Sequence, residues 1–197
     1  MVAPIPAMIL AGGRATRMGG GDKCLRRVGS DRLIDLVIAR LATQAGPLAL
    51  NANGNPERFS EFGLPVVPDS MVGFVGPLAG VLAGMDWAAE LGFDQIATVA
   101  ADTPFFPLDL VARLISEGPL ALAATQEGGK IYRQPTFGLW PVALRDDLRT
   151  ALEDGLRKVV LWTDRHHAGQ AVWDVDNLNP FFNINTPEDI AKAEARL

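Results

Sequence analysis

AMILAGGRATRMGGGDK, residues 7–23, is the stretch that decides how the chain is interpreted. It begins with a short apolar run, which is typical of a buried parallel strand. The run leads into five glycines, which free the backbone to turn tightly and to aim N–H groups at phosphate oxygens. Arg14, Arg17 and Lys23 add positive charge to the same segment. The stretch therefore predicts a strand followed by a loop that binds a polyanion.

The spacing of this loop excludes two well-known phosphate-binding motifs. A Walker A motif needs Gly, Lys and Ser or Thr in succession, whereas here Asp22 separates Gly21 from Lys23, and Cys24 follows. The glycines also never fall in the G-x-G-x-x-G register of a dinucleotide-binding fingerprint. Taken alone, the stretch leaves a flexible surface loop open as the alternative.

Length, composition and charge narrow the class of protein. The 197 residues are enough for one domain with a substantial core, and an apolar fraction of 48% fits a globular protein. No apolar run approaches the roughly 18 residues of a membrane span, and the N-terminus lacks the features of a signal peptide. A single cysteine excludes an internal disulfide and a Cys-based zinc site. The net charge of −5 argues against non-specific nucleic-acid binding. We therefore expect a cytoplasmic protein that binds neither nucleic acid nor membrane.

Apolar, strand-like runs alternate with helical periodicity along almost the whole chain. This alternation predicts an α/β fold with a mostly parallel sheet and helices on both faces. Strand-like runs follow the start of the chain at residues 48–50, 66–67, 96–101, 120–124, 136–140, 171–175 and 181–184, and helical patterns begin near Leu33, Pro77, Leu108, Leu144 and Pro187. No linker or repeat interrupts them, so we expect a single domain over residues 1–197.

Polar residues stand directly after four of the expected strands. They are the glycine loop after the first strand, then Asn51-Ala52-Asn53-Gly54, Pro68-Asp69-Ser70 and Asp102-Thr103-Pro104. In open parallel sheets, ligands bind beyond the carboxyl ends of the strands. We therefore expect these four segments to open on one edge of the sheet and to form the binding site.

Asp102 is the strongest candidate for a metal ligand. A carboxylate at the end of a buried strand is held rigidly, and Mg²⁺ often uses only one or two protein carboxylates beside water and phosphate oxygens. An Asx turn before Pro104 is the alternative. Asn51 and Asp69 offer the donors and acceptors that read a base edge or a ribose hydroxyl, yet both types are ordinary turn residues. Lys23 follows a glycine run and two arginines, which favours phosphate binding over a solvated surface lysine.

Other reactive side chains are given no role. His166 and His167 are adjacent, so they do not share a helix face, and we interpret them as a surface helix end. Cys24 is interpreted as a small buried hydrophobe. No G-x-S-x-G elbow is present, and two histidines offer little material for a hydrolase triad.

Together these motifs resemble the molybdenum cofactor guanylyltransferases, which share the Rossmann-like nucleotidyltransferase fold. The resemblance covers nearly the whole chain, and its carriers are residues 10–13, 17–19, 22–23, 51–53, 68–70, 76–80, 102–104 and 183–188. It implies transfer of GMP from GTP to molybdenum-bearing molybdopterin, with release of pyrophosphate and formation of molybdopterin guanine dinucleotide. It also implies Mg²⁺ as cofactor. We expect a monomer whose protein partners are molybdenum-insertion proteins and apo-molybdoenzymes or their chaperones.

The resemblance also implies which residues hold GTP. The expected GTP-binding residues are Leu10, Ala11, Gly12, Gly13, Lys23, Asn51, Asp69 and Asp102. Asp102 is expected to bind Mg²⁺, and the candidate catalytic residues are Arg17, Lys23 and Asp102. The GTP-binding half is expected over about residues 1–105. Because a phosphate monoester is already an adequate nucleophile, the reaction needs positioning and charge neutralisation more than a general base.

The pterin side is expected over about residues 106–197. Asn183 and Asn185 match the family's pair near the metal and the pterin, and Arg133 and Gln134 complete the expected pterin-binding set. Gln134 is a departure, because the family commonly has histidine before this proline. The sequence therefore leaves the contribution of that segment to pterin recognition open.

Three other functions stay open at this point. The nearest are the cytidylyl relative that acts on the same pterin and a sugar-1-phosphate nucleotidyltransferase. The third is a protein that carries a pterin cofactor without catalysis. Gly12-Gly13 favours the guanylyl family, since the cytidylyl loop usually reads Leu-Ala-Ala-Gly, and the presence of Lys23 and Asp102 argues against a carrier.

Overall fold

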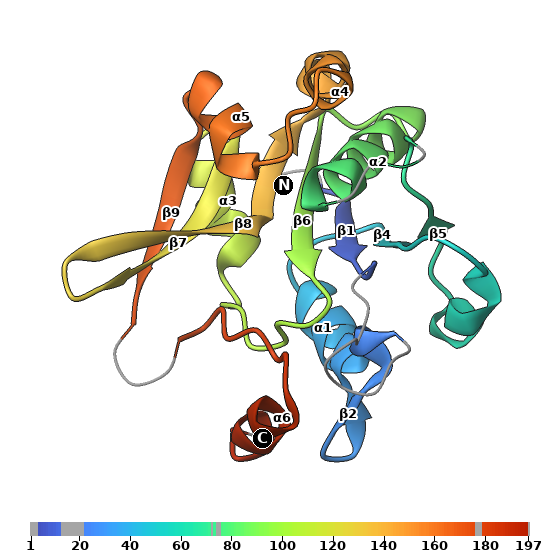
Figure 1. Cartoon of the computed structure of the whole chain (residues 1–197), viewed down its shortest axis with the longest axis vertical. Helices are drawn as coiled ribbons and strands as arrows, with labels where there is room; N and C mark the ends of the chain where they lie inside the picture. The colour runs from blue at the N-terminus through green and yellow to red at the C-terminus, as the bar shows by residue number, and fades with distance from the viewer. Residues whose placement is uncertain (1–3, 13–21, 72, 74–75, 176–178, 197) are drawn as a thin grey trace.

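The structure is a computed structural model that describes residues 4–12, 22–71, 73, 76–175 and 179–196. Within these residues seven strands form one sheet in the order β5-β4-β1-β6-β8-β7-β9 (Figure 1). The strands are β1 (Ala7–Leu10), β4 (Leu48–Asn51), β5 (Val66–Val67), β6 (Gln95–Ala100), β7 (Ala121–Glu127), β8 (Lys130–Pro141) and β9 (Gly169–Asp174).

The sheet is mostly parallel. β5, β4, β1 and β6 run parallel to one another, and β7 runs parallel to β9. β8 is antiparallel to both of its neighbours, β6 and β7. The parallel half explains the apolar character of β1, since a strand that is covered on both faces needs apolar side chains on both. The predicted α/β, Rossmann-like fold is confirmed.

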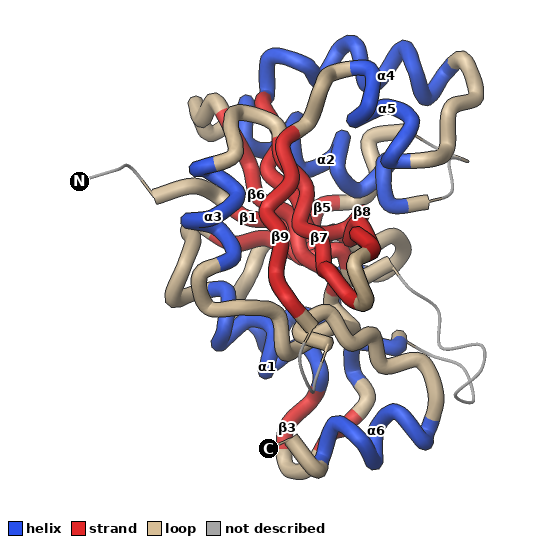
Figure 2. Tube along the Cα trace, turned by 90° about the vertical axis from the view of Figure 1, so that its left-hand side faces the viewer, coloured by secondary structure: helices blue, strands red, loops and turns tan. Residues whose placement is uncertain are grey.

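Helices cover both faces of the sheet (Figure 2). α1 (Leu33–Leu41) and α3 (Leu110–Ser116) pack on one face in a core that includes Ile9. α2 (Pro77–Glu90), α4 (Arg145–Glu153) and α5 (Val159–Arg165) pack on the other face in a core that includes Met8. Successive residues of a strand point to opposite faces, so these two neighbours in β1 anchor the two layers.

A smaller unit lies beyond the carboxyl ends of the strands. The two-stranded ribbon of β2 (Arg27–Val28) and β3 (Asp31–Arg32) lies beside α6 (Pro187–Glu194), and Val28, Leu33, Ile184 and Ala193 bury a common core between them (Figure 1). The start of α6 is capped as its sequence predicts, because the Thr186 hydroxyl accepts from the Asp189 N–H at 3.2 Å. The C-terminal segment is thereby held near the sheet edge where ligands are expected.

Short 3₁₀ turns complete the described chain. They are η2 (Lys23–Leu25), η3 (Pro56–Phe62) and η4 (Val142–Leu144). None of the helices in the described part of the chain has the length and hydropathy that crossing a membrane requires.

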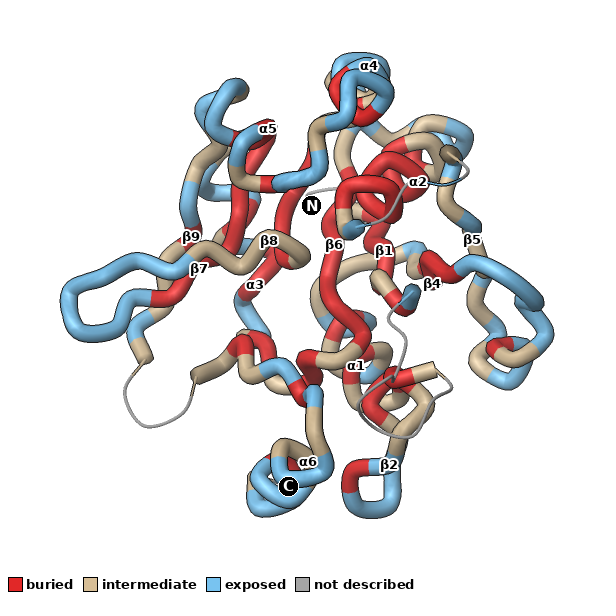
Figure 3. The backbone as a smooth tube through the Cα atoms, viewed as in Figure 1, coloured by how far each residue is buried: buried red, intermediate tan, exposed pale blue. Residues whose placement is uncertain are grey.

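Two expectations from the sequence need correction. Residues 181–184 form no strand, because Phe181 and Ile184 are buried by side-chain packing instead of a ladder, Phe181 against aromatic rings and Ile184 in the core beside α6. The Phe181 ring lies edge-on to Phe137 at 4.9 Å and to Trp173 at 5.5 Å. The second correction concerns β8, which begins at Lys130 rather than at 136, since the turn at 128–129 lets it pair with the end of β7. Residues 126–132 of this hairpin are exposed, which is why no apolar pattern marks them (Figure 3).

Candidate functional site

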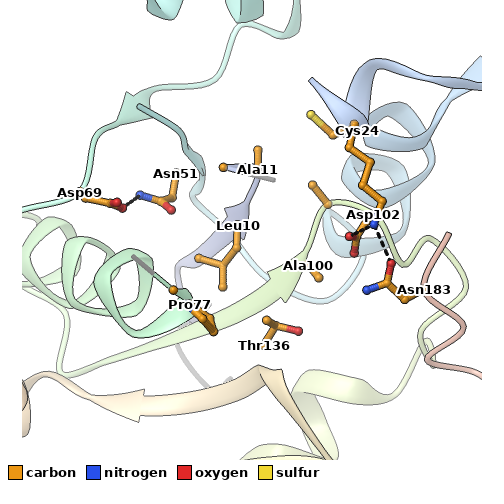
Figure 4. A pocket seen from close by; sticks show the side chains of 14 residues that line it. Leu10, Ala11, Cys24, Asn51, Asp69, Pro77, Ala100, Asp102, Thr136 and Asn183 are labelled. Carbon is orange, nitrogen blue, oxygen red and sulfur yellow. Dashed lines mark hydrogen bonds and ion pairs between the residues drawn. The ribbon is translucent and has the colours of Figure 1, made fainter. Parts of the chain in front are cut away.

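A cavity of about 370 Å³ opens at the carboxyl ends of β1, β4 and β6. Eight of the residues expected at the site line it, namely Leu10, Ala11, Gly12, Lys23, Asn51, Asp69, Asp102 and Asn183. As expected, the segments after β4, β5 and β6 share one edge with Ala11 and Gly12, the described start of the glycine loop. Figure 4 shows that the polar side chains gather at two separate places, with Leu10 between them. We call these the amide end and the cation end.

The amide end consists of Asn51, Asn53 and Asp69. Asn51 is the last residue of β4, and it pairs in parallel register with Val67 at the end of β5, so Asp69 follows alongside. The Asn51 amide donates to Asp69 Oδ1 at 2.9 Å, and the Asn53 amide donates to Asp69 Oδ2 at 2.7 Å. The Asp69 backbone N–H in turn donates to Asn53 Oδ1 at 2.9 Å. Two amides therefore fix the carboxylate in one orientation.

A glycine in the first turns of α2 makes room for this end. A Cβ on Gly80 would lie 2.4 Å from Asn51 Oδ1 and 2.9 Å from Leu10 Cδ2, distances that real Cβ atoms do not show. Gly80 therefore lets the helix approach the Asn51 side chain closely. Gly80 lies in the segment 76–80 that carries the family resemblance, but its role could not be predicted, because the need for a missing side chain is visible only in three dimensions.

The cation end consists of Lys23, Asp102, Asn183 and Asn185. The Lys23 ammonium donates to Asp102 Oδ2 at 2.5 Å, to Asn183 Oδ1 at 2.9 Å and to Asn185 Oδ1. Lys23 is 8% exposed, and a buried ammonium is stable only when its donors are paired. Three oxygens from two distant segments satisfy it.

Two backbone elements position this end. η2 carries Lys23 on its first residue, directly after the loop that follows β1. Asp102 stands two residues beyond β6, and its backbone carbonyl accepts from the Ile184 N–H at 2.9 Å. This bond brings Asn183 and Asn185, which flank Ile184, onto the ammonium.

The cation end has the chemistry of a hard-cation site. Its acceptors are one carboxylate and two amide oxygens, and oxygen ligands are what Mg²⁺ and Ca²⁺ take. Across the described ranges there is no cluster of three or more His, Cys, Asp or Glu side chains that would form an all-protein cage. A divalent ion held here would therefore complete its shell with water and ligand oxygens, as Mg²⁺ commonly does.

Cys24 lines the same cavity without adding a reactive group. The side chain is 2% exposed, and burial, helped by the Asp22 carboxylate, raises the pKa of the Cys24 thiol to about 12. A thiol with this pKa is protonated at neutral pH and is a poor nucleophile. The interpretation of Cys24 as a small buried hydrophobe is confirmed.

The remaining candidates lie elsewhere or outside the described residues. Arg133 forms an ion pair with Asp164 in α5, and the Gln134 amide donates to the Tyr132 carbonyl at 3.3 Å. Neither lines the cavity, although Thr136, further along β8, does. The structure therefore does not bring Arg133 and Gln134 together with Asn183 and Asn185. Gly13 and Arg17 lie outside the described residues.

His166 follows the end of α5, as interpreted from the sequence. Its ring nitrogen Nε2 lies 2.8 Å from Asp147 Oδ1, and the Trp162 indole N–H donates to the same oxygen at 2.8 Å. Burial alone would raise the pKa of Asp147, but these two hydrogen bonds outweigh it and hold the pKa below its usual value. The cluster fastens α5 to α4, and it lies among residues that do not line the cavity.

Related proteins align with this chain over almost its whole length. A molybdenum cofactor guanylyltransferase from Rhodopseudomonas palustris is 52% identical over an alignment that covers 96% of this chain and 90% of that protein. One from Mesorhizobium japonicum is 48% identical over 98% of this chain and 95% of that protein.

Solved structures agree on the fold. The molybdopterin-guanine dinucleotide biosynthesis protein A from Archaeoglobus fulgidus is 23% identical, with a TM-score of 0.73 and 98% of each chain covered. A 4-diphosphocytidyl-2C-methyl-D-erythritol synthase from Anaerococcus prevotii is 15% identical, with a TM-score of 0.72, 98% of this chain covered and 95% of that one. At such identities the likeness speaks for the fold alone.

The family is identified from sequence matches that cover most of the chain. A model of the MobA-like NTP transferase domain matches residues 7–168, which include Lys23, the amide end and Asp102. This match and the identities near 50% agree with each other. The chain is therefore a nucleotidyltransferase and belongs to the MobA-like NTP transferase family, together with proteins named molybdenum cofactor guanylyltransferase.

Proposed function

We propose that this enzyme transfers GMP from GTP to molybdenum-bearing molybdopterin, forming molybdopterin guanine dinucleotide and releasing pyrophosphate. The observation that carries the proposal is the two-ended cavity, in which a fixed carboxylate and a buried ammonium face the same space. A nucleoside triphosphate has the matching two ends, a base with hydrogen-bonding edges and a polyanion.

The amide end would hold the nucleoside. Asp69 keeps acceptor capacity beyond the two amide bonds that fix it, because a carboxylate has about four lone-pair sites. A fixed acceptor suits the N–H groups of a guanine edge or a ribose hydroxyl. Leu10, Ala11 and Gly12 line the space next to it, and a Cβ on Gly12 would meet no atom within 4 Å. The absent side chain of Gly12 leaves room for a purine here.

The cation end would hold the triphosphate and Mg²⁺. Asp102, Asn183 and Asn185 would hold the ion, as their oxygen donors fit it. When bound, Mg²⁺ neutralises phosphate charge and favours the leaving pyrophosphate. Lys23, whose ammonium sits on a flexible stem, pairs with phosphate oxygens once a nucleotide enters, and Arg17 adds charge from the glycine loop. These residues position and neutralise the reactants, and the phosphate monoester of the pterin attacks without a protein base.

The pterin would lie on the C-terminal side, over about residues 106–197. Asn183 and Asn185 connect that side to Lys23, and Arg133 and Gln134 would contact the pterin from the neighbouring surface of β8. Residues 1–105 would supply most of the GTP site. We further propose a cytoplasmic monomer that receives its substrate from molybdenum-insertion proteins and passes the product to apo-molybdoenzymes or their chaperones.

A nucleotide screen tests the proposed reaction. Pyrophosphate release is measured for GTP, CTP, ATP and UTP with Mg²⁺, in the presence and absence of molybdenum-loaded molybdopterin. We expect release that requires both GTP and the pterin. Equal release with CTP would favour cytidylyl transfer, release with a sugar 1-phosphate in place of the pterin would favour a sugar-nucleotide enzyme, and pterin binding without release would favour a carrier.

A further inference from the structure

Arg58 lies outside the cavity and contacts residues behind both of its ends. It belongs to η3, the 3₁₀ turn between β4 and β5. Its guanidinium contacts the Asp22 side chain on one side and the backbone carbonyls of Asn53 and Asn55 on the other. Arg58 is not among the residues expected at the site from the sequence, and the proposed reaction does not use it.

On the cation side, Arg58 holds the residue that precedes Lys23. Arg58 Nε lies 2.7 Å from Asp22 Oδ2. The Asp22 carbonyl accepts from the Leu25 N–H at 3.2 Å, so Asp22 begins the turn that carries Lys23. Any movement of Asp22 therefore shifts the base of the Lys23 side chain.

On the amide side, Arg58 holds the turn that fixes Asp69. Its Nη2 donates to the Asn53 carbonyl at 2.7 Å, and its Nη1 donates to the Asn55 carbonyl at 2.5 Å. Asn53 is the residue whose side chain both donates to Asp69 and accepts from it. Arg58 therefore holds the backbone of Asn53, which directly contacts Asp69, the carboxylate proposed to bind the base.

We propose that Arg58 is a positioning residue that sets the distance between the amide end and the cation end, and so prepares the cavity to bind both ends of one nucleotide. The inference rests on the proposed function, because it takes the amide end as the nucleoside site and the cation end as the triphosphate site. A ligand that bridges two sites gains from their fixed spacing, since the second contact then becomes intramolecular.

The surroundings of Arg58 distinguish it from an ordinary surface arginine. Its guanidinium lies 4.6 Å from the centre of the buried Phe59 ring. Its Nε is buried and has no directed hydrogen-bond acceptor among the described residues, so Asp22 is bound to it by charge alone. This buried Nε depends on the Asp22 carboxylate for its compensation, whereas a fully exposed ion pair contributes little.

Arg32, in β3, packs against the same 3₁₀ turn and offers a matched control. Arg32 lies 4.4 Å from the centre of the Phe62 ring and forms ion pairs with Asp35 and Glu61. Its side chain is 24% exposed, against 28% for Arg58, and it is not among the residues that line the cavity. Arg32→Ala therefore removes the same kind of packing and charge contact without touching either end.

The test compares GTP binding by the full chain and its Arg58→Ala, Arg58→Lys and Arg32→Ala variants, using calorimetric titration, with thermal unfolding as a check of the fold. We expect the GTP dissociation constant of Arg58→Ala to rise about tenfold, that of Arg58→Lys to rise less, and that of Arg32→Ala to stay within about twofold. Arg58→Lys keeps the charge towards Asp22 but cannot serve two carbonyls in a planar fork. Unchanged GTP affinity in Arg58→Ala, or an equal loss in Arg32→Ala, would overturn the proposal.

Guanosine and inorganic triphosphate, titrated separately, probe each end on its own. If Arg58 sets the spacing, both fragments should bind Arg58→Ala within about twofold of the unmodified protein, since only the bridging ligand depends on it. A loss for guanosine or for triphosphate equal to the loss for GTP would mean that Arg58 serves one end only, and would overturn the coupling. Failure of the unmodified protein to bind GTP would instead refute the proposed function.

Discussion

The two ends of the cavity are built in different ways. The amide end joins residues at or just beyond the ends of neighbouring parallel strands, and Asn51 and Asp69 are 18 positions apart. The cation end joins Lys23 to Asp102, 79 positions away, and to Asn183, 160 positions away. One end is thus a direct product of strand pairing, and the other forms only when the C-terminal segment returns to the sheet edge.

The difference in chemistry matches the difference in construction. At the amide end neutral donors fix a carboxylate, an arrangement suited to selecting a ligand by its hydrogen bonds. At the cation end a buried ammonium and a carboxylate face each other with two amide oxygens, an arrangement suited to managing charge. Substitutions at the two ends should therefore have different kinetic effects.

The largest effect is expected for Asp102→Asn. The change removes the one carboxylate of the cation end but keeps an oxygen that can accept from Lys23. We expect kcat for guanylyl transfer to fall by about 10²-fold or more at ordinary Mg²⁺ levels, because charge stabilisation in the transition state is lost. Circular dichroism should show an unchanged fold. Near-normal turnover would remove Asp102 from the proposed metal site.

Lys23→Ala should weaken GTP binding by about 10- to 100-fold, the range expected when charge-assisted hydrogen bonds are lost. Lys23→Arg should restore binding only in part, because a planar guanidinium differs in shape from an ammonium. Calorimetric titration with GTP measures both. Unchanged affinity in the alanine variant would mean that Lys23 only ties Asp102 to Asn183 and Asn185.

Gly80→Ala perturbs the amide end and the neighbouring Leu10, and leaves the cation end in place. The new methyl would displace the Asn51 side chain, and we expect the GTP dissociation constant to rise about tenfold while kcat changes little. Gly84→Ala is the matched control, one turn further along α2, where a Cβ would meet Ile96 and Met8 in the core at 3.2 and 3.4 Å. Equal GTP affinity in Gly80→Ala and Gly84→Ala would show that the position of the Asn51 side chain does not matter for GTP binding.

The smallest effect is expected for Gln134→His. Gln134 lies outside the cavity and bonds within the β7–β8 hairpin. We expect its replacement to change the apparent affinity for the pterin and to leave GTP affinity within about twofold. The apparent affinities for GTP and for the pterin are measured separately. A change confined to GTP affinity would mean that this segment belongs to the GTP side of the cavity.

The sequence predicted the amide end better than the cation end for a physical reason. An apolar run followed by a polar residue marks the end of a parallel strand, so Asn51 and Asp69 could be assigned to one edge. At the cation end the same signal reaches Asp102 but neither Asn183 nor Asn185. Contact between Lys23 and Asn185 depends instead on the path of residues 181–184, which were expected to be a strand. Asn183 and Asn185 were expected at the site only because the sequence resembles the family, since the hydrophobic periodicity does not mark them.

Some elements that were not predicted do have a signal in the sequence. α5 buries Val159, Trp162 and Thr163, whose spacing of three and four positions is that of a helix face. β2, β3 and the exposed half of β8 had no such signal, since they are short or exposed and their pairing is made by backbone groups. The role of Gly80 was also out of reach, because it consists in the absence of an atom.

The most direct test of the account compares the preference for GTP over CTP in three proteins, measured by competition binding: the unmodified chain, Asn51→Ala and Asp102→Asn. If the amide end selects the nucleoside and the cation end handles the phosphates, the unmodified chain prefers GTP strongly. Asp102→Asn then keeps that preference although it has lost turnover, and Asn51→Ala loses most of it. Equal binding of GTP and CTP by the unmodified chain, or the same loss of preference in both variants, would contradict the account.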